Sequence, residues 1–292
     1  MYHSLAEAIA DAERQGKTLA VCALEMEARD QGRTVEDIRE ALGRALAVMR
    51  HAVEQGLTGD LRSTSGLVGG DAAKLRSGPA GPLHGTVFRD VLMRALAVQE
   101  VNAAMGVIVA APTAGGAGVL PGVLLGLAAK HDLADAQLVD ALATAGLIGA
   151  VVAQRASLSG AEGGCQAETG AAAGMAAGAA TEMLGGTPAQ VGTAVALAQQ
   201  GTLGLVCDPL GGLVELPCVF RNATGAAIAL AGIEMALAGI TFAIPADEVI
   251  DTMGEIGREM DVRYRETAGG GLAATPTGRR LAKERLVELK KR

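Results

Sequence analysis

Residues 171–180 read AAAGMAAGAA, seven alanines and two glycines around one methionine. Alanine is the strongest helix former, so this stretch predicts a helix, which we extend over 166–184. Side chains this small leave the helix without a polar face, and it must therefore pack tightly against other helices or against a cofactor. We expect it to be a buried element at the centre of the fold.

The composition extends this prediction to the whole chain. Alanine and glycine make up 99 of 292 residues, whereas Trp is absent and Phe and Tyr total five. The β-branched and aromatic richness of an all-β protein is missing. The sequence therefore predicts an all-α fold, a large helical bundle forming one domain over 1–292, with further helices over 88–105, 119–130, 135–155, 187–201, 219–239 and 247–260.

The first 60 residues are the most polar part of this domain and predict amphipathic helices. Ser4 and Glu7 have the spacing of a capping box, and Thr34 and Asp37 predict a weaker cap for a later helix. A further helix is predicted between them, over 18–30. The short β-like run 106–110 cannot support a sheet.

Charge and composition exclude several classes of function. The net charge is −7 and aromatic residues are scarce, which argues against nucleic-acid binding because phosphates require a basic surface and single strands require stacking platforms. The one basic run, 279–292, holds seven Lys or Arg against two Glu and predicts a solvated terminal helix. The charged N-terminus lacks the apolar segment of a signal peptide, so we expect a cytoplasmic protein.

Two apolar runs raise the question of membrane insertion. Residues 141–153 are fewer than the roughly 20 that a spanning helix needs, and 223–244 is interrupted by Glu234. Buried helices of a bundle explain both runs, and we expect no membrane partner. A helical transporter or assembly module without any metal is the alternative.

Glycine-rich loops separate the apolar helices. Glycine permits positive φ angles and close backbone approach, so several such loops that meet in space can line a pocket with backbone N–H groups. The alternative is that each loop is a flexible connector. The loops cover 63–71, 76–85, 110–118, 157–164, 206–217 and 266–278.

Three of the four cysteines lie in or beside these loops. Cys165, Cys207 and Cys218 are separated by 41 and 10 residues, which matches neither the paired spacing of zinc sites nor that of bacterial ferredoxins. A metal or cluster site, three unrelated buried cysteines and a catalytic cysteine all stay open on spacing alone. Cys22 lies on the apolar face of a predicted helix and is expected in the core; as a fourth ligand it would close the site of an electron carrier.

Five motifs follow one another along the chain: STSGLVGGD (63–71), VNAAMGVIVAAPTAGGAGVLPG (101–122), GGCQAETGAAAGMAAGA (163–179), GLVCDPLGGLVELPCVFRNATGAAIA (204–229) and RETAGGGLAATPTG (265–278). Together they resemble the iron–sulfur-dependent L-serine dehydratases, specifically the separate alpha subunit of the two-subunit form. The resemblance covers nearly the whole chain.

This resemblance implies a function and a cofactor. It implies that Cys165, Cys207 and Cys218 bind a 4Fe–4S cluster, and that the chain deaminates L-serine to pyruvate and ammonia without pyridoxal phosphate. Three thiolates leave one iron open, which can act as a Lewis acid toward the serine hydroxyl. Single-chain relatives end in a cysteine that can fill this position; this sequence ends in LKKR (289–292), so water or another small ligand is expected there.

The resemblance also implies a partner. A separate beta subunit with an ACT-type regulatory domain is expected, and the complex is expected to be a hetero- or homo-oligomer. The Gly-rich loops would then form a cluster-containing active site in the alpha subunit.

Polar residues in or near the motifs are the candidates for substrate binding and proton transfer. Lys74 is the candidate base, if desolvation lowers its pKa; the alternatives are that it is a solvated surface lysine and that His84 is the base. Arg221 is a candidate clamp for the carboxylate or a counter-charge for the cluster, and Asp71 is expected to cap the helix that carries Lys74. Uncharged candidates for recognition of the amine and carboxylate are Ser63, Ser65, Asn102, Thr113 and Asn222.

Overall fold

The computed structural model describes residues 1–79 and 81–289, and these residues form thirteen α-helices without a β-strand. The all-α prediction is therefore confirmed. The helices are α1 (Leu5–Gln15), α2 (Leu19–Gln31), α3 (Val35–Gly56), α4 (Asp71–Ser77), α5 (Val87–Ala103), α6 (Val119–His131), α7 (Asp135–Arg155), α8 (Gly160–Gly163), α9 (Ala171–Met183), α10 (Pro188–Gln200), α11 (Cys218–Leu237), α12 (Ala246–Glu259) and α13 (Pro276–Leu289).

Five short turns join them: η1 (Ala114–Gly116), η2 (Gln166–Gly170), η3 (Leu210–Gly212), η4 (Val262–Tyr264) and η5 (Gly271–Ala274). The predicted helix over 166–184 differs from the structure in its first part, because η2 is a π-helical turn that runs directly into α9. A π-helical turn changes the direction in which the following side chains point, and such turns are frequent at functional sites.

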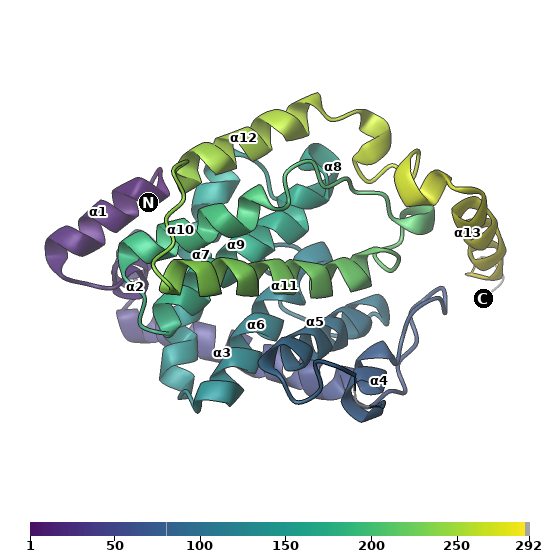
Figure 1. Cartoon of the computed structure of the whole chain (residues 1–292), viewed down its shortest axis with the longest axis horizontal. Helices are drawn as coiled ribbons and strands as arrows, with labels where there is room; N and C mark the ends of the chain where they lie inside the picture. The colour runs from purple at the N-terminus through teal and green to yellow at the C-terminus, as the bar shows by residue number, and fades with distance from the viewer. Residues whose placement is uncertain (80, 290–292) are drawn as a thin grey trace.

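The alanine-rich helix α9 lies at the centre of the bundle (Figure 1). All of its residues from 171 to 181 are buried, and α6, α7, α10 and α11 pack around it. A Cβ added at Gly174 would lie 2.7 Å from Gln199, and one at Gly178 would overlap Ile148. Glycine thus sets how closely α10 and α7 approach α9, and the prediction of a surrounded helix is confirmed.

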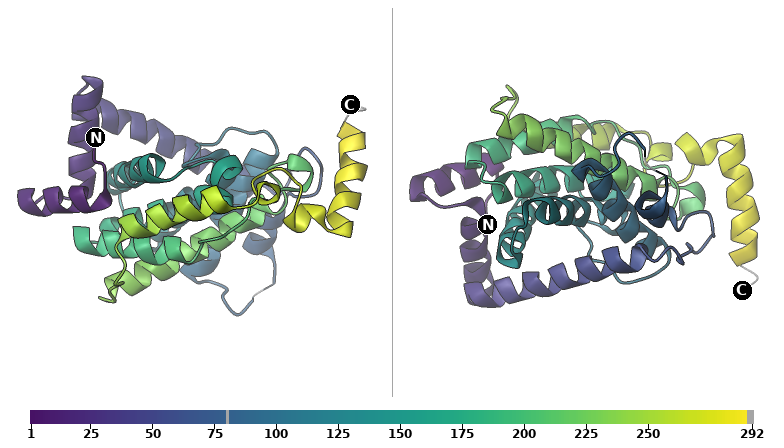
Figure 2. Two further views of the ribbon diagram at one scale, coloured as in Figure 1. Left: turned by 90° about the horizontal axis from the view of Figure 1, so that it is seen from above. Right: turned by 60° about the horizontal axis from the view of Figure 1, so that its bottom comes forward.

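The other helices form layers around this centre. α5 packs on α6 and α11, α3 and α4 cover α5, and α2 packs on α7. α12 lies across α10 at the top of Figure 1, while α13 projects from the end of the molecule opposite α1. Figure 2 shows that α3 runs along the edge of the bundle and that α13 stands apart from it, in contact with η3 and η5.

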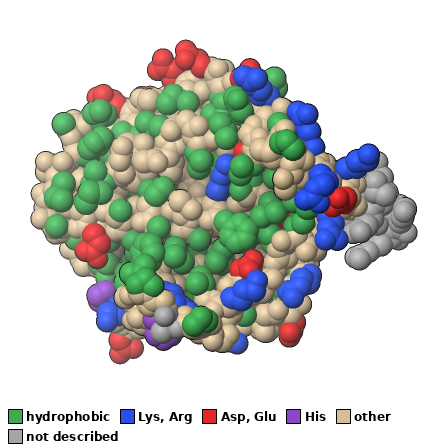
Figure 3. Space-filling view, turned by 45° about the vertical axis from the view of Figure 1, so that its right-hand side comes forward, with side chains coloured by type: hydrophobic (Ala, Val, Ile, Leu, Met, Phe, Trp, Pro, Cys, Tyr) green, Lys and Arg blue, Asp and Glu red, His purple; other side chains and the backbone are tan. Residues whose placement is uncertain are grey.

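The basic C-terminal run forms the projecting helix α13. Lys and Arg side chains gather at this end of the molecule, on the right of Figure 3. Arg279 and Arg280 are exposed, and Arg280 forms an ion pair with Glu284 at 3.2 Å. This agrees with the predicted solvated helix, although residues 290–292 of the run lie outside the described residues.

Helix α7 is the one described helix that is long and apolar enough to cross a membrane by length and composition. It has 21 residues, so the length argument drawn from 141–153 alone does not hold for the complete helix. Two thirds of its most apolar window is buried against the rest of the chain, chiefly by α9 and α2. Packing inside the bundle therefore accounts for its apolar sequence.

Local caps start several helices, but their order of strength is the reverse of the prediction. Thr34 and Asp37 form a complete capping box at α3, in which each side chain accepts a hydrogen bond from the other residue's backbone N–H. Ser4 accepts from the N–H of Glu7, whereas the Glu7 carboxylate accepts from the N–H of His3 rather than from that of Ser4.

Carboxylates from distant elements also hold three helix N-termini, that of α1 among them. Asp247 of α12 accepts from the first two N–H groups of α1 at 2.8 and 2.9 Å. Glu182 of α9 accepts from the first two of α2 at 2.6 and 3.0 Å. Glu100 of α5 accepts from the N–H of Asp71, the first residue of α4, at 2.6 Å. The expected capping of α4 by the Asp71 side chain is therefore wrong, because that carboxylate binds Lys74 instead.

A matched pair of glycines in α3 tests this packing. A Cβ at Gly56 would overlap the backbone of Ala97 in α5, whereas one at Gly43 would meet no atom within 4 Å. We expect Gly56→Ala to lower the free energy of unfolding by about 1–3 kcal/mol through overpacking. Gly43→Ala should raise it by roughly 0.5–1 kcal/mol, because alanine costs less entropy in a helix. Urea denaturation of both variants measures the difference, and equal effects would contradict the tight α3–α5 crossing.

Candidate active site

Three buried cysteines come together from segments that are far apart in the sequence. Cys165 lies between α8 and η2, Cys207 lies in the loop before η3, and Cys218 is the first residue of α11. Their exposed fractions are 3%, 2% and 6%, and none forms a disulfide. Cys22 is buried elsewhere, in α2, as the sequence predicts.

Burial dominates the protonation of these three thiols. It raises the pKa of each of them, and that of Cys218 to about 12. The charge of Cys165 raises the pKa of Cys207 and of Cys218 further, so the thiols lie within electrostatic reach of one another. Arg221 has the opposite effect on the pKa of Cys165 and Cys218. The three thiols therefore share one buried region with a cation beside it.

A buried carboxyl group, that of Glu168 in η2, lies next to the thiols. Its Oε1 accepts a hydrogen bond from Thr113 at 2.7 Å, and its Oε2 lies 3.9 Å from the Sγ of Cys207. A Cβ at Gly115 or Gly160 would come within 2.7 Å of this carboxylate, so both glycines leave room for it. Burial raises the pKa of Glu168. Glu168 is not among the site residues predicted from the sequence, although it lies only three positions after Cys165.

Arg221 on α11 is engaged by the loops around it. Its guanidinium forms an ion pair with Asp208 at 2.7 Å and donates to the carbonyl of Val206 at 2.8 Å. Asp208 also accepts from the N–H of Leu272 at 2.6 Å, which links the loops 206–217 and 266–278. The residue thus fixes a positive charge beside the thiols, and its use as a clamp for a carboxylate stays a prediction.

Two asparagines hold the loop 110–118 in place. The Nδ2 of Asn222 donates to the carbonyls of Gly115 and Cys218 at 2.7 and 2.9 Å, and its Oδ1 accepts from the N–H of Gly118 at 2.9 Å. Asn102 at the end of α5 donates to the carbonyl of Ala114 at 3.2 Å. Both side chains position backbone beside the cysteines, and direct recognition of substrate by them, or by Thr113, stays a prediction.

The loop 63–71 joins this region through a third buried carboxylate. Glu215, 4% exposed, accepts a hydrogen bond from the hydroxyl of Ser63 at 2.6 Å and from the N–H of Ser65 at 2.9 Å, and also bonds to the Ser65 hydroxyl. Both hydroxyls therefore hold the loop against the segment between Cys207 and Cys218. Substrate binding by the two serines stays a prediction.

The two candidate bases lie outside this buried region. The Lys74 side chain is 77% exposed and forms an ion pair with Asp71 at 2.7 Å, so its amine is in contact with solvent. His84 is exposed in the loop after α4. In the described part of 76–85, no hydrogen bond links the backbone to the other Gly-rich loops. The remaining loops do meet around the cysteines, as the sequence analysis expects.

Glu100, which caps α4 at the end of the loop 63–71, makes the stability of this region depend on pH. Burial raises its pKa above the usual value near 4.5. Its stabilising contribution is therefore complete below that value and is lost as pH rises toward the raised folded-state pKa. We expect Glu100→Gln, which keeps an acceptor for the α4 N–H, to gain stability relative to the unmodified chain as pH rises from 4.5. Urea unfolding at several pH values tests this, and a constant difference would contradict it.

The donor set of the three cysteines suits a cluster. In the part of the chain that the structure describes, no three His, Cys, Asp or Glu side chains are placed to share one metal ion. The cysteines of a 4Fe–4S cluster each bind a different iron and therefore stand farther apart than the ligands of a single ion. Here the three thiols are free and buried, and Gly160, whose added Cβ would lie 3.1 Å from the Sγ of Cys207, leaves space beside them.

Comparison with known proteins gives the family. The family model for the serine dehydratase alpha chain matches residues 5–273. The chain is 53% identical to a probable L-serine dehydratase alpha chain of Bacillus subtilis, over 90% of this chain and 87% of the relative. It is 38% identical to the L-serine dehydratase alpha chain of Peptoniphilus asaccharolyticus, with 99% of both chains covered. An L-serine dehydratase of Streptomyces coelicolor is 42% identical, but only 57% of its length is matched. The chain belongs to the serine dehydratase alpha chain family.

Proposed function

We propose that this chain is the catalytic subunit of an iron–sulfur-dependent L-serine ammonia-lyase that converts L-serine to pyruvate and ammonia. The observation that carries the proposal is the group of three free, buried thiols that share one region with Arg221 and Glu168. The relatives named as L-serine dehydratases support the choice of substrate.

In this proposal Cys165, Cys207 and Cys218 hold a 4Fe–4S cluster. When bound, the cluster supplies an iron without a protein thiolate, which serves as a Lewis acid for the hydroxyl of the substrate. The cation of Arg221 offsets part of the negative charge that three thiolates place in a buried region. Its ion pair with Asp208 keeps it next to the segment that carries Cys207. Pyridoxal phosphate has no part in the proposal.

The reaction removes hydroxide from Cβ and a proton from Cα of L-serine. The resulting 2-aminoacrylate tautomerises to an imine, which water hydrolyses to pyruvate and ammonia. The chain's contribution is to orient the substrate and to limit access of water, through loops fixed by Asn222, Glu215 and the Thr113–Glu168 pair. Lys74 stays the proposed base, and its exposure means that a partner must cover it to exclude solvent from its amine.

We propose that this partner is a separate beta subunit with an ACT-type domain, in a cytoplasmic oligomer. The names of the alpha-chain relatives support a second subunit. The segment after α5 also exposes large apolar side chains, those of Met105 at 83% and Val107 at 71%, close to the loop 63–71. A covering subunit would remove this apolar surface from water.

Formation of pyruvate from L-serine tests the proposal. The chain is reconstituted with iron and sulfide without oxygen, and assayed alone and after co-expression with an ACT-domain partner. We expect pyruvate in the presence of the partner, and faster loss of activity in air than under anaerobic storage because one iron is open. An intact cluster without pyruvate in either sample would contradict the proposed activity.

A further inference from the structure

A cavity of about 390 Å³ lies between α8 and α12, on the far side of α8 from Cys207. Figure 1 shows α12 passing over α8 at the top of the molecule. Gly160, the first residue of α8, faces the Sγ of Cys207, whereas the next three residues of α8 line the cavity. The cavity therefore adjoins the cysteine region but is separated from its thiols by one turn of helix.

Glycines shape this cavity. A Cβ at Gly257 of α12 would lie 2.8 Å from the Cα of Gly163, and one at Gly254 would lie 3.2 Å from Ala156. The backbone of α12 thus packs directly on the segments before and within α8. Gly163 and Ala167 belong to the cavity wall and flank Cys165 in the sequence, so a bound molecule would touch the segment that carries this thiol.

Two arginines line the cavity without a partner. Within residues 1–79 and 81–289, no hydrogen bond or ion pair engages the side chain of Arg258 or of Arg265. The Nε of Arg265 is buried and has no acceptor. A buried donor without an acceptor is costly, and native proteins provide one, from the chain, from water or from a ligand. Arg258 is exposed to solvent, so the buried donor that lacks an acceptor is that of Arg265, and Arg258 adds a second guanidinium to the same cavity wall. Guanidinium groups are suited to a carboxylate.

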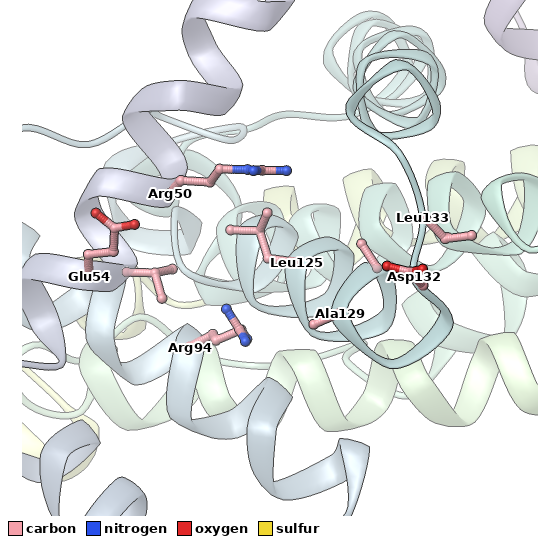
Figure 4. A pocket seen from close by; sticks show the side chains of 9 residues that line it. Arg50, Glu54, Arg94, Leu125, Ala129, Asp132 and Leu133 are labelled. Carbon is pink, nitrogen blue, oxygen red and sulfur yellow. The ribbon is translucent and has the colours of Figure 1, made fainter.

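A second cavity, of about 320 Å³ beside α3, is also lined by two arginines and serves as a comparison (Figure 4). Arg50 and Arg94 extend toward it from α3 and α5. However, Arg50 is paired with Asp135, and Arg94 with Asp90 at 2.8 Å, so their charges are already balanced by the chain. Among the described residues, Arg258 and Arg265 form no such ion pair.

The cavity at α12 also contains one acidic group. Glu162 of α8 is held by a hydrogen bond from the hydroxyl of Ser157 at 2.6 Å, and both residues line the cavity. Glu162 forms no ion pair with Arg258 or Arg265, so more than 4.0 Å separates its oxygens from their nitrogens. A cation site and an anion site therefore stand apart in one small space, which is the pattern that complements a zwitterion.

We propose that this cavity binds a small zwitterionic α-amino acid, with its carboxylate on Arg258 and Arg265 and its ammonium group on Glu162. The choice of L-serine as the natural ligand rests on the proposed function, whereas the class of ligand does not. Arg265 is joined to Cys207 by backbone pairing, since Cys207 N–H donates to the Tyr264 carbonyl at 2.8 Å and Glu266 N–H donates to that of Cys207 at 2.8 Å. The bound amino acid would thus contact the segments of two cysteines.

Binding of L-alanine and of propionate to the full chain tests the assignment, by calorimetry or ligand-observed NMR. L-alanine has no β-hydroxyl, so binding is measured without turnover, and propionate lacks the ammonium group. We expect Arg265→Gln and Arg258→Gln each to weaken both ligands at least about tenfold, as loss of a hydrogen bond to a charged group does. Glu162→Gln should weaken L-alanine by a similar factor and leave propionate unchanged.

The matched control is Arg263→Gln, because Arg263 is near Arg265 in the sequence but exposed and stacked on Tyr264. This variant should bind both ligands as the unmodified chain does. Thermal melting establishes that each variant is folded. Where an arginine-to-glutamine variant is not folded, the corresponding Arg258→Lys or Arg265→Lys variant is tested in its place. Unchanged L-alanine binding in the arginine variants, or no binding at millimolar concentration to the unmodified chain, would overturn the proposal. Neither result bears on pyruvate formation, so a failure here and a failure of the proposed function are distinguishable.

Discussion

Replacing Cys207 with alanine is expected to abolish both iron binding and pyruvate formation. Changes to residues that merely support a metal ligand commonly cost 10–100-fold, so loss of a ligand should reduce activity by more than about 100-fold. Cys165→Ala and Cys218→Ala should have the same effect, because the three thiols share one buried region. Iron and sulfide content after anaerobic reconstitution, together with the pyruvate assay, measures the effect. Full iron content in any of the three variants would contradict the assigned ligand set.

Cys22→Ala is the matched control for this series. Cys22 is buried like the others but lies in α2, and its pKa is raised by burial and by the charge of Asp11, a residue of α1. The variant should keep its iron and its activity. Loss of iron in Cys22→Ala would instead favour a fully closed site with four cysteine ligands, and with it an electron carrier rather than a lyase.

Replacing Glu215 with alanine is expected to lower the free energy of unfolding by about 3 kcal/mol, since buried donors to a charged acceptor lose their partner. Ser63 and Ser65 both depend on this carboxylate. Because Glu215 lies between Cys207 and Cys218, release of its loop should also reduce the iron content. Urea denaturation and iron analysis of the variant measure the two effects.

The comparison for this variant is Glu40→Ala, which removes an exposed carboxylate of α3 that lies 4.0 Å from Arg44. Exposed ion pairs contribute roughly 0–1 kcal/mol, so this change should have little effect on stability and none on iron content. Equal destabilisation by the two substitutions would show that the Glu215 hydrogen bonds do not hold the loop in place.

Features encoded in neighbouring residues could be predicted from the sequence. The alanine-rich run requires a surrounded helix, and α9 is surrounded. The bounds of α7 are those predicted, since Gln137 closes its first turn and Arg155 ends the apolar pattern. The meeting of the Gly-rich loops was also predictable in outline, because three cysteines and many glycines mark the same segments.

Features that depend on tertiary contacts could not be predicted. Asp71 has the position of a helix cap, but the cap of α4 is supplied by Glu100 from 29 residues away. Lys74 follows the motif 63–71, and the sequence leaves open whether it is a desolvated base or a solvated surface lysine; the fold decides for the solvated one. Glu168 has no local signal beyond its distance from Cys165, because its meaning comes from Thr113 and from glycines of two other loops.

The Asp247 carboxylate, which caps the N-terminus of α1 from 242 residues away, affects the order in which the chain folds. While a ribosome is still making the first half of the protein, neither Asp247 nor Glu182 exists to accept the N–H groups at the starts of α1 and α2. These two helices can form and break repeatedly in that period, since isolated short helices are marginal in water. The first two N–H groups of each helix gain these acceptors only when α9 and α12 have emerged and packed, which makes the earliest-synthesised segment among the last to become protected from hydrogen exchange.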